Sequence, residues 1–389
     1  MAHARTAVVL GGSVAGLITA QVLSDRYDTV TVIDRDTPPD AALPRRGVPQ
    51  SRQLHVLLAR GRLALDEIFA GFSGDLTGAG APLVDLNEEV HWFNDGYRMR
   101  RAPSDLVGVG ASRPLIEHAM RARVRQLPNV ELCPGIVATG LLTEADGNRV
   151  RGVTVTPYGS ETVSDLPADL VVDACGRATR TPVWLAGLGC PIAREERVPV
   201  DVTYVSRFYE RNSGHLGGLS GLLINAVPGR PRTGIVAVQE NGRFAVALSG
   251  VLGEQPPGDD EGYARFAESL GVPELTEMIR AAVPVTEPVR MRYPESVRRR
   301  YERLGRFPRG FLVTGDALCS FNPVYGQGIT VAVLQGLMLR DLFRSGGDPD
   351  WRRFFRKAAR IIDGPWSISA GTDLRFSGVL GGGRPRCGL

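Results

Sequence analysis

Two glycine-rich segments, far apart in the chain, carry the residues best suited to bind a nucleotide cofactor. The first, Gly11-Gly12-Ser13-Val14-Ala15-Gly16, follows the apolar stretch Ala7–Leu10 and matches a G-x-G-x-x-G turn, except that Ser13 replaces the middle glycine. Such a turn between a strand and a helix brings backbone N–H groups and a helix N-terminus to a pyrophosphate. An ordinary strand, turn and helix has the same pattern, so this segment alone is a weak signal.

Asp34 strengthens the first motif. It follows the β-branched stretch Val30–Ile33, about twenty residues after the glycine turn, where a carboxylate accepts hydrogen bonds from a ribose. A carboxylate at this position also disfavours a cofactor with a 2′-phosphate. The structural alternative is an ordinary turn residue at the end of a strand.

The second segment begins with Asp316, which follows the apolar stretch Phe311–Gly315. This order predicts a carboxylate at the carboxyl edge of a sheet, where such folds bind ligands. Gly326 and Gly328 then allow backbone N–H groups to approach a ligand, and a helix beginning near Gly328 directs its positive N-terminus to the same place. A nicotinamide cofactor needs only the first segment, so the pair indicates FAD. A capped Gly/Pro loop is the structural alternative.

The composition excludes several other classes of protein. The chain has 389 residues, of which 43% are hydrophobic and 23% charged. Its net charge of +4 is spread along the chain, and no basic segment contains interleaved aromatic residues. These features are typical of a globular protein with no nucleic-acid partner. The five cysteines and five histidines are dispersed, which argues against a disulfide framework and against a metal site. No apolar run reaches membrane-spanning length, so we expect a cytoplasmic protein.

The first part of the chain reads as an α/β domain. Apolar spacing predicts helices over Val14–Leu23 and Arg52–Phe69, and a further helix that Ser112 caps. The glycine-rich stretch Gly71–Gly80 is expected to be a loop, and Leu170–Val172 a buried parallel strand.

From about Val198 the pattern changes to alternating strands. Asn241-Gly242 separates two apolar runs and predicts a hairpin, two helices are expected between Asp259 and Ala282, and Val285–Tyr293 is expected to be a return strand. The predicted fold class is therefore α/β, an α+β arrangement of two domains, with a β-sheet substrate domain interrupting a Rossmann-like FAD-binding domain. We expect residues 1–80, 100–195 and 295–380 to form the FAD-binding domain, residues 81–99 and 196–294 the substrate domain, and residues 381–389 a disordered tail.

Taken together, the motifs resemble those of the class A flavoprotein monooxygenases, the para-hydroxybenzoate hydroxylase-like superfamily. Leu170-Val171-Val172-Asp173-Ala174-Cys175-Gly176 is similar to its third signature, a strand that ends in an Asp-Gly element. The stretches Arg45–Gln50, Leu54–Gly61, Ser112–Glu117 and Thr181–Leu185 are similar to the bacterial flavin epoxidases of polyether biosynthesis, which are relatives of squalene epoxidase. The resemblance runs from Ala7 to about Phe376.

This resemblance implies FAD as the cofactor, NADPH or NADH as a transient electron donor, and no catalytic side chain, because the flavin carries the chemistry. By analogy Arg45 or Arg46, together with Arg113, contacts FAD; the two loop arginines could equally be a solvated surface pair. The motifs and the resemblance give one set of expected cofactor-binding residues: Gly11, Gly12, Ser13, Ala15, Gly16, Asp34, Arg35, Arg45, Arg46, Arg113, Asp173, Gly315, Asp316, Pro323, Gly326, Gly328 and Ile329.

The expected reaction is epoxidation of an alkene in an apolar polyketide or terpenoid-like small molecule, with O₂ as co-substrate and a C4a-hydroperoxyflavin as oxidant. No obvious base for activating a phenol stands in the sequence. The apolar candidates for the pocket are Trp92, Phe93, Tyr204, Phe208 and Met291, although residues of these types are more often part of the core, and spacing does not decide between the two. The alternatives are an aromatic hydroxylase of the same fold, a flavin reductase or dehydrogenase of the geranylgeranyl-reductase type, and a non-catalytic flavin-binding protein.

Two further features bear on these alternatives. Flavin halogenases share the FAD motifs, but the lysine in the first third of the chain and the Trp-x-Trp-x-Ile-Pro segment that they need are absent. Epoxidases of the type named above usually continue with another helical segment, whereas this chain ends in Gly-Gly-Gly-Arg-Pro-Arg-Cys-Gly-Leu. We therefore expect less cover over the site, which bears on activity rather than on the FAD fold.

Overall fold

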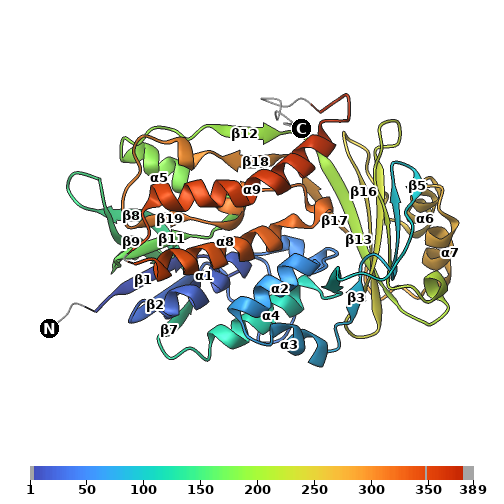
Figure 1. Cartoon of the computed structure of the whole chain (residues 1–389), viewed down its shortest axis with the longest axis horizontal. Coiled ribbons are helices and arrows are strands. Elements are labelled where there is room, and N and C mark those ends of the chain that lie inside the picture. Colours follow the sequence, from blue (N-terminus) through green and yellow to red (C-terminus); the bar gives the residue numbers. More distant parts are fainter. Residues whose placement is uncertain (1–3, 347, 380–389) are drawn as a thin grey trace.

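A five-stranded parallel sheet forms the centre of the larger part of the molecule (Figure 1). The computed structural model describes residues 4–346 and 348–379. Each strand of this sheet pairs in parallel with its neighbours, and β1 and β11 are almost wholly buried, as expected for a sheet covered on both faces. In spatial order the strands are β19 (Phe311–Val313), β11 (Leu170–Asp173), β1 (Thr6–Leu10), β2 (Thr29–Asp34) and β7 (Val130–Pro134).

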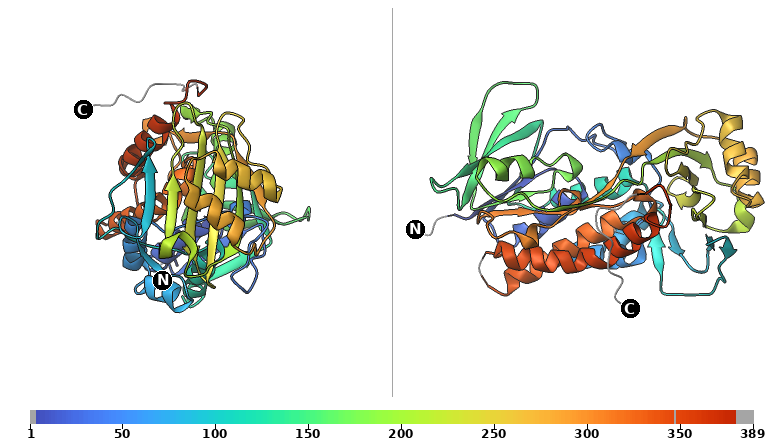
Figure 2. Two further views of the ribbon diagram at one scale, coloured as in Figure 1. Left: turned by 90° about the vertical axis from the view of Figure 1, so that its right-hand side faces the viewer. Right: turned by 90° about the horizontal axis from the view of Figure 1, so that it is seen from above.

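Helices cover one face of this sheet, and a small antiparallel sheet covers the other (Figure 2). The central helix α8 (Gln327–Arg344) packs against α1 (Val14–Ser24), α2 (Ala59–Ile68) and α9 (Trp351–Asp373). A Cβ atom on Gly336 of α8 would lie 2.3 Å from Cγ2 of Ile18, so the absence of a side chain lets α1 and α8 approach closely. The small sheet consists of β10 (Ser164–Pro167), β9 (Val150–Pro157) and β8 (Ile136–Thr143).

A seven-stranded sheet stands at the other end of the molecule (Figure 1). Its outer face packs against α6 (Asp260–Glu268) and α7 (Pro273–Ala281) in a separate hydrophobic cluster. Asn241 and Gly242 both have positive φ, 61° and 63°, in the turn between β15 and β16, which confirms the predicted hairpin. In spatial order the strands are β17 (Val289–Tyr293), β13 (Val202–Glu210), β16 (Arg243–Gly250), β15 (Arg232–Gln239), β14 (Gly221–Ile224), β4 (Val90–Asn94) and β5 (Tyr97–Arg98).

The remaining elements connect these parts. β3 pairs with β6, and β12, β18 and β20 form a three-stranded sheet. Ser112 caps α4 by accepting a hydrogen bond from the backbone of Leu115, as predicted. The bounds are α3 (Phe72–Gly78), α4 (Arg113–Val124), α5 (Thr181–Gly187), β3 (Leu83–Asp85), β6 (Val107–Val109), β12 (Glu195–Val198), β18 (Ser296–Arg299) and β20 (Cys319–Ser320), with 3₁₀ turns at Pro49–Arg52, Gly176–Ala178, His215–Gly218, Tyr301–Arg303, Gly315–Ala317 and Pro323–Tyr325.

Three predicted elements differ from the structure. The helix expected over Arg52–Phe69 begins only at Ala59, because Leu57 forms a two-bond bridge with Val109 and holds the preceding residues extended. The loop expected over Gly71–Gly80 contains α3, which buries Phe72 and Leu76, one turn apart, despite its glycines. The return strand is shorter than expected and begins at Val289. The predicted tail, residues 381–389, lies outside the described residues.

In the described part of the chain, no helix combines the length and the apolar character that crossing a membrane requires. Within the same residues, no group of His, Cys, Asp and Glu side chains is arranged to hold a metal ion.

The close approach of α1 and α8 makes a testable prediction. Gly336→Ala should lower the free energy of unfolding by about 1–3 kcal/mol, because the new methyl group overpacks against Ile18. Gly371→Ala in α9 is the matched control: nothing lies within 4 Å of its Cβ position, so the variant should gain about 0.5–1 kcal/mol from helix propensity. Denaturant unfolding would measure both, and equal effects in the two variants would contradict the packing argument.

Candidate cofactor site

The first glycine turn lies at the carboxyl end of β1 and has no room for side chains. Gly11 has φ 98°, and a Cβ atom there would lie 2.7 Å from the carbonyl oxygen of Ala174; a Cβ atom on Gly16 would lie 1.7 Å from the carbonyl oxygen of Gly11. The side chain of Ser13, the N-cap residue of α1, makes no capping hydrogen bond. The N-terminus of α1 therefore suits an anionic ligand, since the first-turn N–H groups have no partner within a helix.

Asp34 lies beside this turn, as predicted, and its carboxylate already holds local structure. Oδ2 accepts hydrogen bonds from the backbone N–H of Gly12 at 2.9 Å and from Nη1 of Arg45 at 3.1 Å. Oδ1 accepts one from the backbone N–H of Asp36 at 2.9 Å. The carboxylate thus joins the end of β2 to the glycine turn and to the arginine loop.

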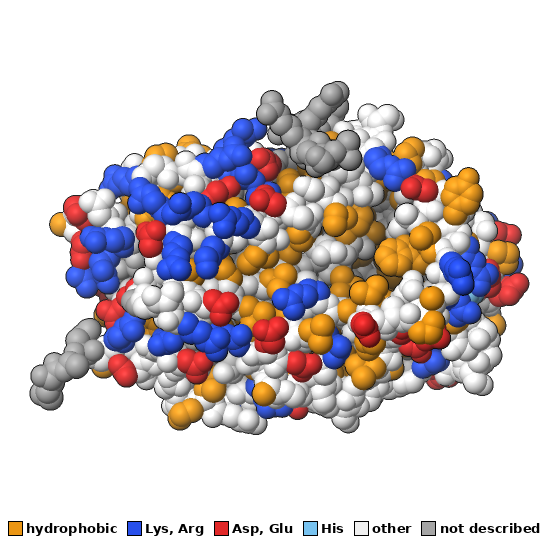
Figure 3. Space-filling model, viewed as in Figure 1, with side chains coloured by type: hydrophobic (Ala, Val, Ile, Leu, Met, Phe, Trp, Pro, Cys, Tyr) orange, Lys and Arg blue, Asp and Glu red, His pale blue; other side chains and the backbone are white. Residues whose placement is uncertain are grey.

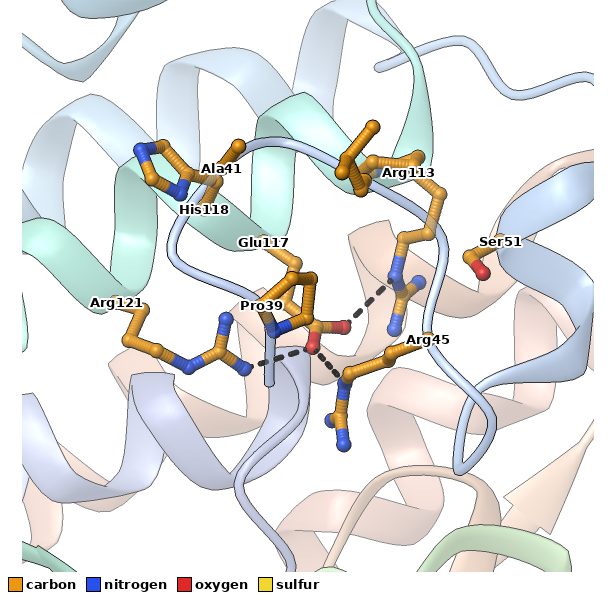
Figure 4. Close-up of a pocket in the computed structure, with 10 residues that line it drawn as sticks. Pro39, Ala41, Arg45, Ser51, Arg113, Glu117, His118 and Arg121 are labelled. Carbon is orange, nitrogen blue, oxygen red and sulfur yellow. Dashed lines mark hydrogen bonds and ion pairs between the residues drawn. The ribbon is translucent and has the colours of Figure 1, made fainter. Parts of the chain in front are cut away.

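A buried ionic cluster around Glu117 supports the turn from α4 (Figure 4). Glu117 accepts hydrogen bonds from Nε of Arg45 at 2.6 Å and from Nη2 of Arg121 at 2.8 Å, and Nε of Arg113 lies 3.5 Å from its other oxygen. Burial opposes the charge of Glu117, but the three guanidinium groups outweigh it and lower its pKa to about 2. The cluster therefore holds an ionised Glu117 among three arginines beside the turn, and Arg45 also pairs with Asp34 and Asp36.

Ser13 connects this cluster to the turn. Its hydroxyl donates to Glu117 Oε2 at 2.8 Å and accepts from Nη2 of Arg113 at 2.8 Å, while Nη2 of Arg121 donates to the carbonyl oxygen of Gly12 at 2.9 Å. A serine at the position of the middle glycine therefore has a defined partner on α4, which explains why this departure from the glycine pattern is accommodated.

The arginine cluster also leaves donors and acceptors unused. Among the described residues, Nη2 of Arg45 and Oγ of Ser51 are buried and have no hydrogen-bond partner. Both residues line a cavity of about 10 Å³ between the loop that carries Pro39 and Ala41 and helix α4 (Figure 4). That volume holds about one water molecule, so this cavity is not itself a cofactor site.

The third motif lies next to the first because β11 pairs with β1. Asp173 is fully buried; its Oδ1 accepts from the backbone of Cys175 at 2.8 Å, and its Oδ2 accepts from the hydroxyl groups of Thr179 and Thr181. Asp173 thus shapes the turn after β11 from within. This turn exposes Cys175, Arg177, Ala178 and Arg180, and the guanidinium of Arg177 lies 4.4 Å from the ring centre of Tyr293.

The second glycine segment completes the same edge. Gly315 has φ 61°, and a Cβ atom there would lie 2.7 Å from Cβ of Ala15, so the turn after β19 contacts the first glycine turn. Gln335 of α8 fixes this turn by accepting from the hydroxyl of Thr314 at 2.7 Å and from the backbone of Gly315 at 2.8 Å. Burial raises the pKa of the half-buried Asp316, against the opposing charges of Arg113 and Arg177.

Helix α8 begins beside Asp316. Gly326 is its N-cap residue with φ 64°, no side chain caps it, and a Cβ atom on Gly328 would lie 3.7 Å from Oδ1 of Asp316. Pro323 starts the 3₁₀ turn before the helix, and Ile329 is half-buried in its first turn. The N-termini of α1 and α8 thus lie at the same edge of the parallel sheet.

Most of the predicted residues therefore come together. Arg35 and Arg46 are exposed and form no hydrogen bond or ion pair within the described residues, so their predicted contacts with a cofactor stay predictions. Sequence reasoning missed Glu117, Arg121 and Gln335 as structural supports. The spacing Arg113, Glu117, Arg121 along one helix was an available signal, because residues four apart share a face.

The inner face of the seven-stranded sheet is the face turned away from α6 and α7. Its residues alternate with those of the outer hydrophobic cluster, which takes Val205, Val236 and Leu248 from the same strands. Ser206 accepts a hydrogen bond from the backbone of Leu54 at 3.3 Å, so this face meets the segment before α2. One uncharged cross-strand row on it runs Trp92, Leu223, Ile235, Ala247, Ser206, Val289.

The side chains of this row are more exposed at its Trp92 end than in its middle. Ala247 is 9% exposed and Trp92 41%. Tyr204, Phe208 and Met291 lie on the same inner face, whereas Phe93 packs against the outer cluster and is not a residue of this face. Figure 3 shows apolar side chains gathered in the middle of the molecular surface, where it is hollowed between α8, α9 and this sheet, with cationic side chains toward α9.

The Glu117 cluster predicts a pH-dependent stability. The folded-state pKa of Glu117 is about 2, below its ordinary value of 4.5, so its contribution to stability is complete above pH 4.5 and is lost as pH falls through 2. Glu117→Gln should therefore cost about 3 kcal/mol at pH 7 and progressively less in acid. Glu261→Gln, at an exposed glutamate of α6, is the control and should stay within about 0.5 kcal/mol. A pH-independent difference in urea unfolding would contradict the assignment.

Comparison with known proteins places the fold. No family model matches the sequence. The flavin-dependent brominase Bmp2 superposes with a TM-score of 0.70 at 14% identity, covering 93% of this chain and 85% of that chain. PqsL from Pseudomonas aeruginosa, described as a probable FAD-dependent monooxygenase, gives 0.66 at 16% identity, covering 97% and 99%. 2-Methyl-3-hydroxypyridine-5-carboxylic acid oxygenase gives 0.64 at 18% identity, covering 94% and 87%.

A relative in sequence is also known. Protein Rv3254 of Mycobacterium tuberculosis is 36% identical over 346 residues, which is 86% of this chain and 72% of that protein. The structural neighbours share the class A flavoprotein fold of FAD-dependent monooxygenases and halogenases, so the predicted fold class is confirmed. The chain therefore belongs to the family of Protein Rv3254 and has the class A flavoprotein fold.

Proposed function

We propose that the protein is an FAD-dependent monooxygenase. One observation carries this proposal: the turns that follow β1, β11 and β19 meet at one edge of the parallel sheet. Two helix N-termini without side-chain caps lie at this edge, and one long dinucleotide would use both. When bound, FAD would supply the redox and oxygen-activating chemistry, which the side chains at this edge do not provide.

The chain's own residues would bind and orient the cofactor. The turn Gly11–Gly16 and the N-terminus of α1 would hold the pyrophosphate, and Asp34 would accept from the ribose. Asp316 would accept from the ribityl hydroxyl groups, and the N-terminus of α8 would stabilise negative charge on the ring. The remaining predicted contacts, Arg35 and Arg46 included, stay proposals.

The proposed substrate is a small apolar molecule with an alkene, of the polyketide or terpenoid kind, and the proposed product is its epoxide. The support is the uncharged row from Trp92 to Val289, which offers apolar and small side chains to a ligand. Alkene oxidation needs no deprotonation of the substrate, whereas phenol hydroxylation is helped by a positioned base. Aromatic hydroxylation, a flavin reductase activity and cofactor binding without catalysis remain the alternatives.

We further propose that NADPH or NADH donates electrons transiently. The exposed guanidinium groups of Arg177 and Arg180, beside the turn that Asp173 shapes, are suited to the phosphates of such a donor. Binding should therefore be weak and sensitive to salt.

The cofactor proposal predicts a coloured protein. Purified protein should retain FAD without a covalent bond, and Asp316→Ala should weaken FAD binding roughly tenfold to 150-fold, since a charge-assisted acceptor contributes about 1.5–3 kcal/mol. Asp341→Ala, at an exposed aspartate on the surface of α8, is the matched control and should bind FAD as the wild type does. Titration of apoprotein with FAD, followed by flavin fluorescence, would measure this. A wild-type protein that cannot be reconstituted with FAD would refute the proposal.

The reaction proposal predicts the source of the product oxygen. With NADPH or NADH, ¹⁸O₂ and candidate polyenes, one labelled atom should enter the product, as mass spectrometry of the product would show. Label found in a phenol, when an arene replaces the polyene in the same mixture, would identify the aromatic hydroxylase instead. Turnover that continues without O₂ would identify a reductase or dehydrogenase, and bound flavin that no donor reduces would favour a non-catalytic flavin-binding protein.

A further inference from the structure

A buried carboxyl group outside the cofactor residues holds the loop that leads into α8. Asp373, in the last turn of α9, is 1% exposed. Its Oδ1 accepts hydrogen bonds from Nδ2 of Asn322 at 2.9 Å and from the hydroxyl of Tyr325 at 2.8 Å. Both donors belong to the short loop between β20 and α8. Asp373 therefore contacts the loop on the side away from the candidate site. The next residue of this loop, Gly326, is the N-cap of α8.

Hydrogen bonds within the loop fix its shape. One side of the loop contacts Asp373, and its other side faces the candidate site. Asn322 Oδ1 accepts from the backbone of Val324 at 3.2 Å, and the N–H of Gly326 donates to the carbonyl of Pro323 at 3.0 Å. A Cβ atom on Gly326 would lie 3.5 Å from Leu58. The two bonds to Asp373 thus join a preformed turn to α9, so a change at Asp373 shifts the turn as a unit.

The charge of Asp373 has no cation to balance it within the described residues. Its Oδ2 is buried without a hydrogen-bond partner there, and no ion pair to Asp373 is recorded. Burial raises its pKa to about 6, against the two hydrogen bonds from Tyr325 and Asn322. Arg375 acts on Tyr325 at longer range, but its guanidinium lies 2.7 Å from Asp95 in the turn between β4 and β5.

This arrangement costs stability at neutral pH. Because the folded-state pKa of Asp373 lies above its ordinary value of 3.8, the stability that this group contributes is greatest below pH 3.8 and is lost as pH rises through about 6. An asparagine would have the same shape and would avoid the cost of a buried charge. What the charge adds is strength, since hydrogen bonds to a carboxylate are about twice as strong as neutral ones.

We propose that Asp373 is a positioning residue whose ionised carboxylate holds the loop Asn322–Gly326, and with it the N-terminus of α8, in the form that binds the flavin. The proposal rests on the proposed FAD function of this edge. The chain just after α9 contacts the edge hairpin of the seven-stranded sheet, where the guanidinium of Arg375 lies 2.7 Å from Asp95. Asp373 therefore ties the loop to the end of α9 that lies next to this contact.

The test compares stability with FAD affinity in Asp373→Asn. At pH 8 this variant should unfold at a higher temperature than the wild type, because a buried charge is removed, yet its apoprotein should bind FAD about tenfold more weakly. A purely structural role would move both quantities in the same direction. Between pH 7.5 and 5, the FAD affinity of the wild type should fall as Asp373 is protonated, whereas Asp373→Asn should lack this contribution to the fall. Because the pKa of Asp316 is also raised, both proteins share any fall due to Asp316, and the difference between their pH profiles isolates the effect of Asp373.

Two further variants complete the design. Tyr325→Phe removes one hydrogen bond but keeps the carboxylate, so it should weaken FAD binding and retain the pH dependence, and it tests the contact should Asp373→Asn fail to fold. Asp341→Asn, an exposed aspartate on α8, should change neither quantity. FAD affinity that neither Asp373→Asn nor Tyr325→Phe alters would overturn the inference alone. Wild-type protein that binds no FAD at any pH would overturn the proposed function and this inference with it.

Discussion

The candidate site depends first on the charge of Glu117. One buried carboxylate receives hydrogen bonds from Arg45 and Arg121, lies against Arg113, and accepts a further bond from Ser13 of the glycine turn. Removal of Glu117 would leave Arg113 and Arg121 without their buried carboxylate and Arg45 with only Asp34 and Asp36, which is more costly than the loss of the hydrogen bonds alone. The arginine loop, α4 and the first turn of α1 therefore meet at one carboxylate, and a ligand at this edge meets a preorganised network of charges.

Close backbone contact is the second constraint. The turns after β1, β11 and β19 touch one another at glycines, where a side chain would collide with Ala174, Gly11 or Ala15. That contact brings the N-termini of α1 and α8 to one place. Neither helix is capped by its own N-cap side chain, a feature that α2, α3, α5 and α7 share. What distinguishes α1 and α8 is that their first-turn N–H groups lie together at the carboxyl edge of the parallel sheet.

Local patterns predicted the strands, the glycine turns and the Asn241-Gly242 hairpin, since each depends on residues near in sequence. The errors arose where distant residues decide. Val109 keeps Leu57 extended and delays α2, and burial of Phe72 and Leu76 makes a helix of a glycine-rich stretch. Gln335 and Asp373 act on turns far away in the chain, so no spacing rule could assign them. The domain boundaries and the individual FAD contacts stay predictions.

Charged side chains are distributed unevenly between the two parts of the molecule. Ionised groups gather at the edge of the parallel sheet, where Asp34, Glu117 and the arginines lie, whereas the inner row of the seven-stranded sheet is uncharged. The proposed FAD cofactor would need charged or polar partners for its phosphates, but an environment without water at its reacting ring. Asp373 lies behind the loop between these two regions, bonded to Asn322 and Tyr325 and without a paired cation in the described chain. A buried charge that costs stability at such a boundary is best explained by what it holds in place.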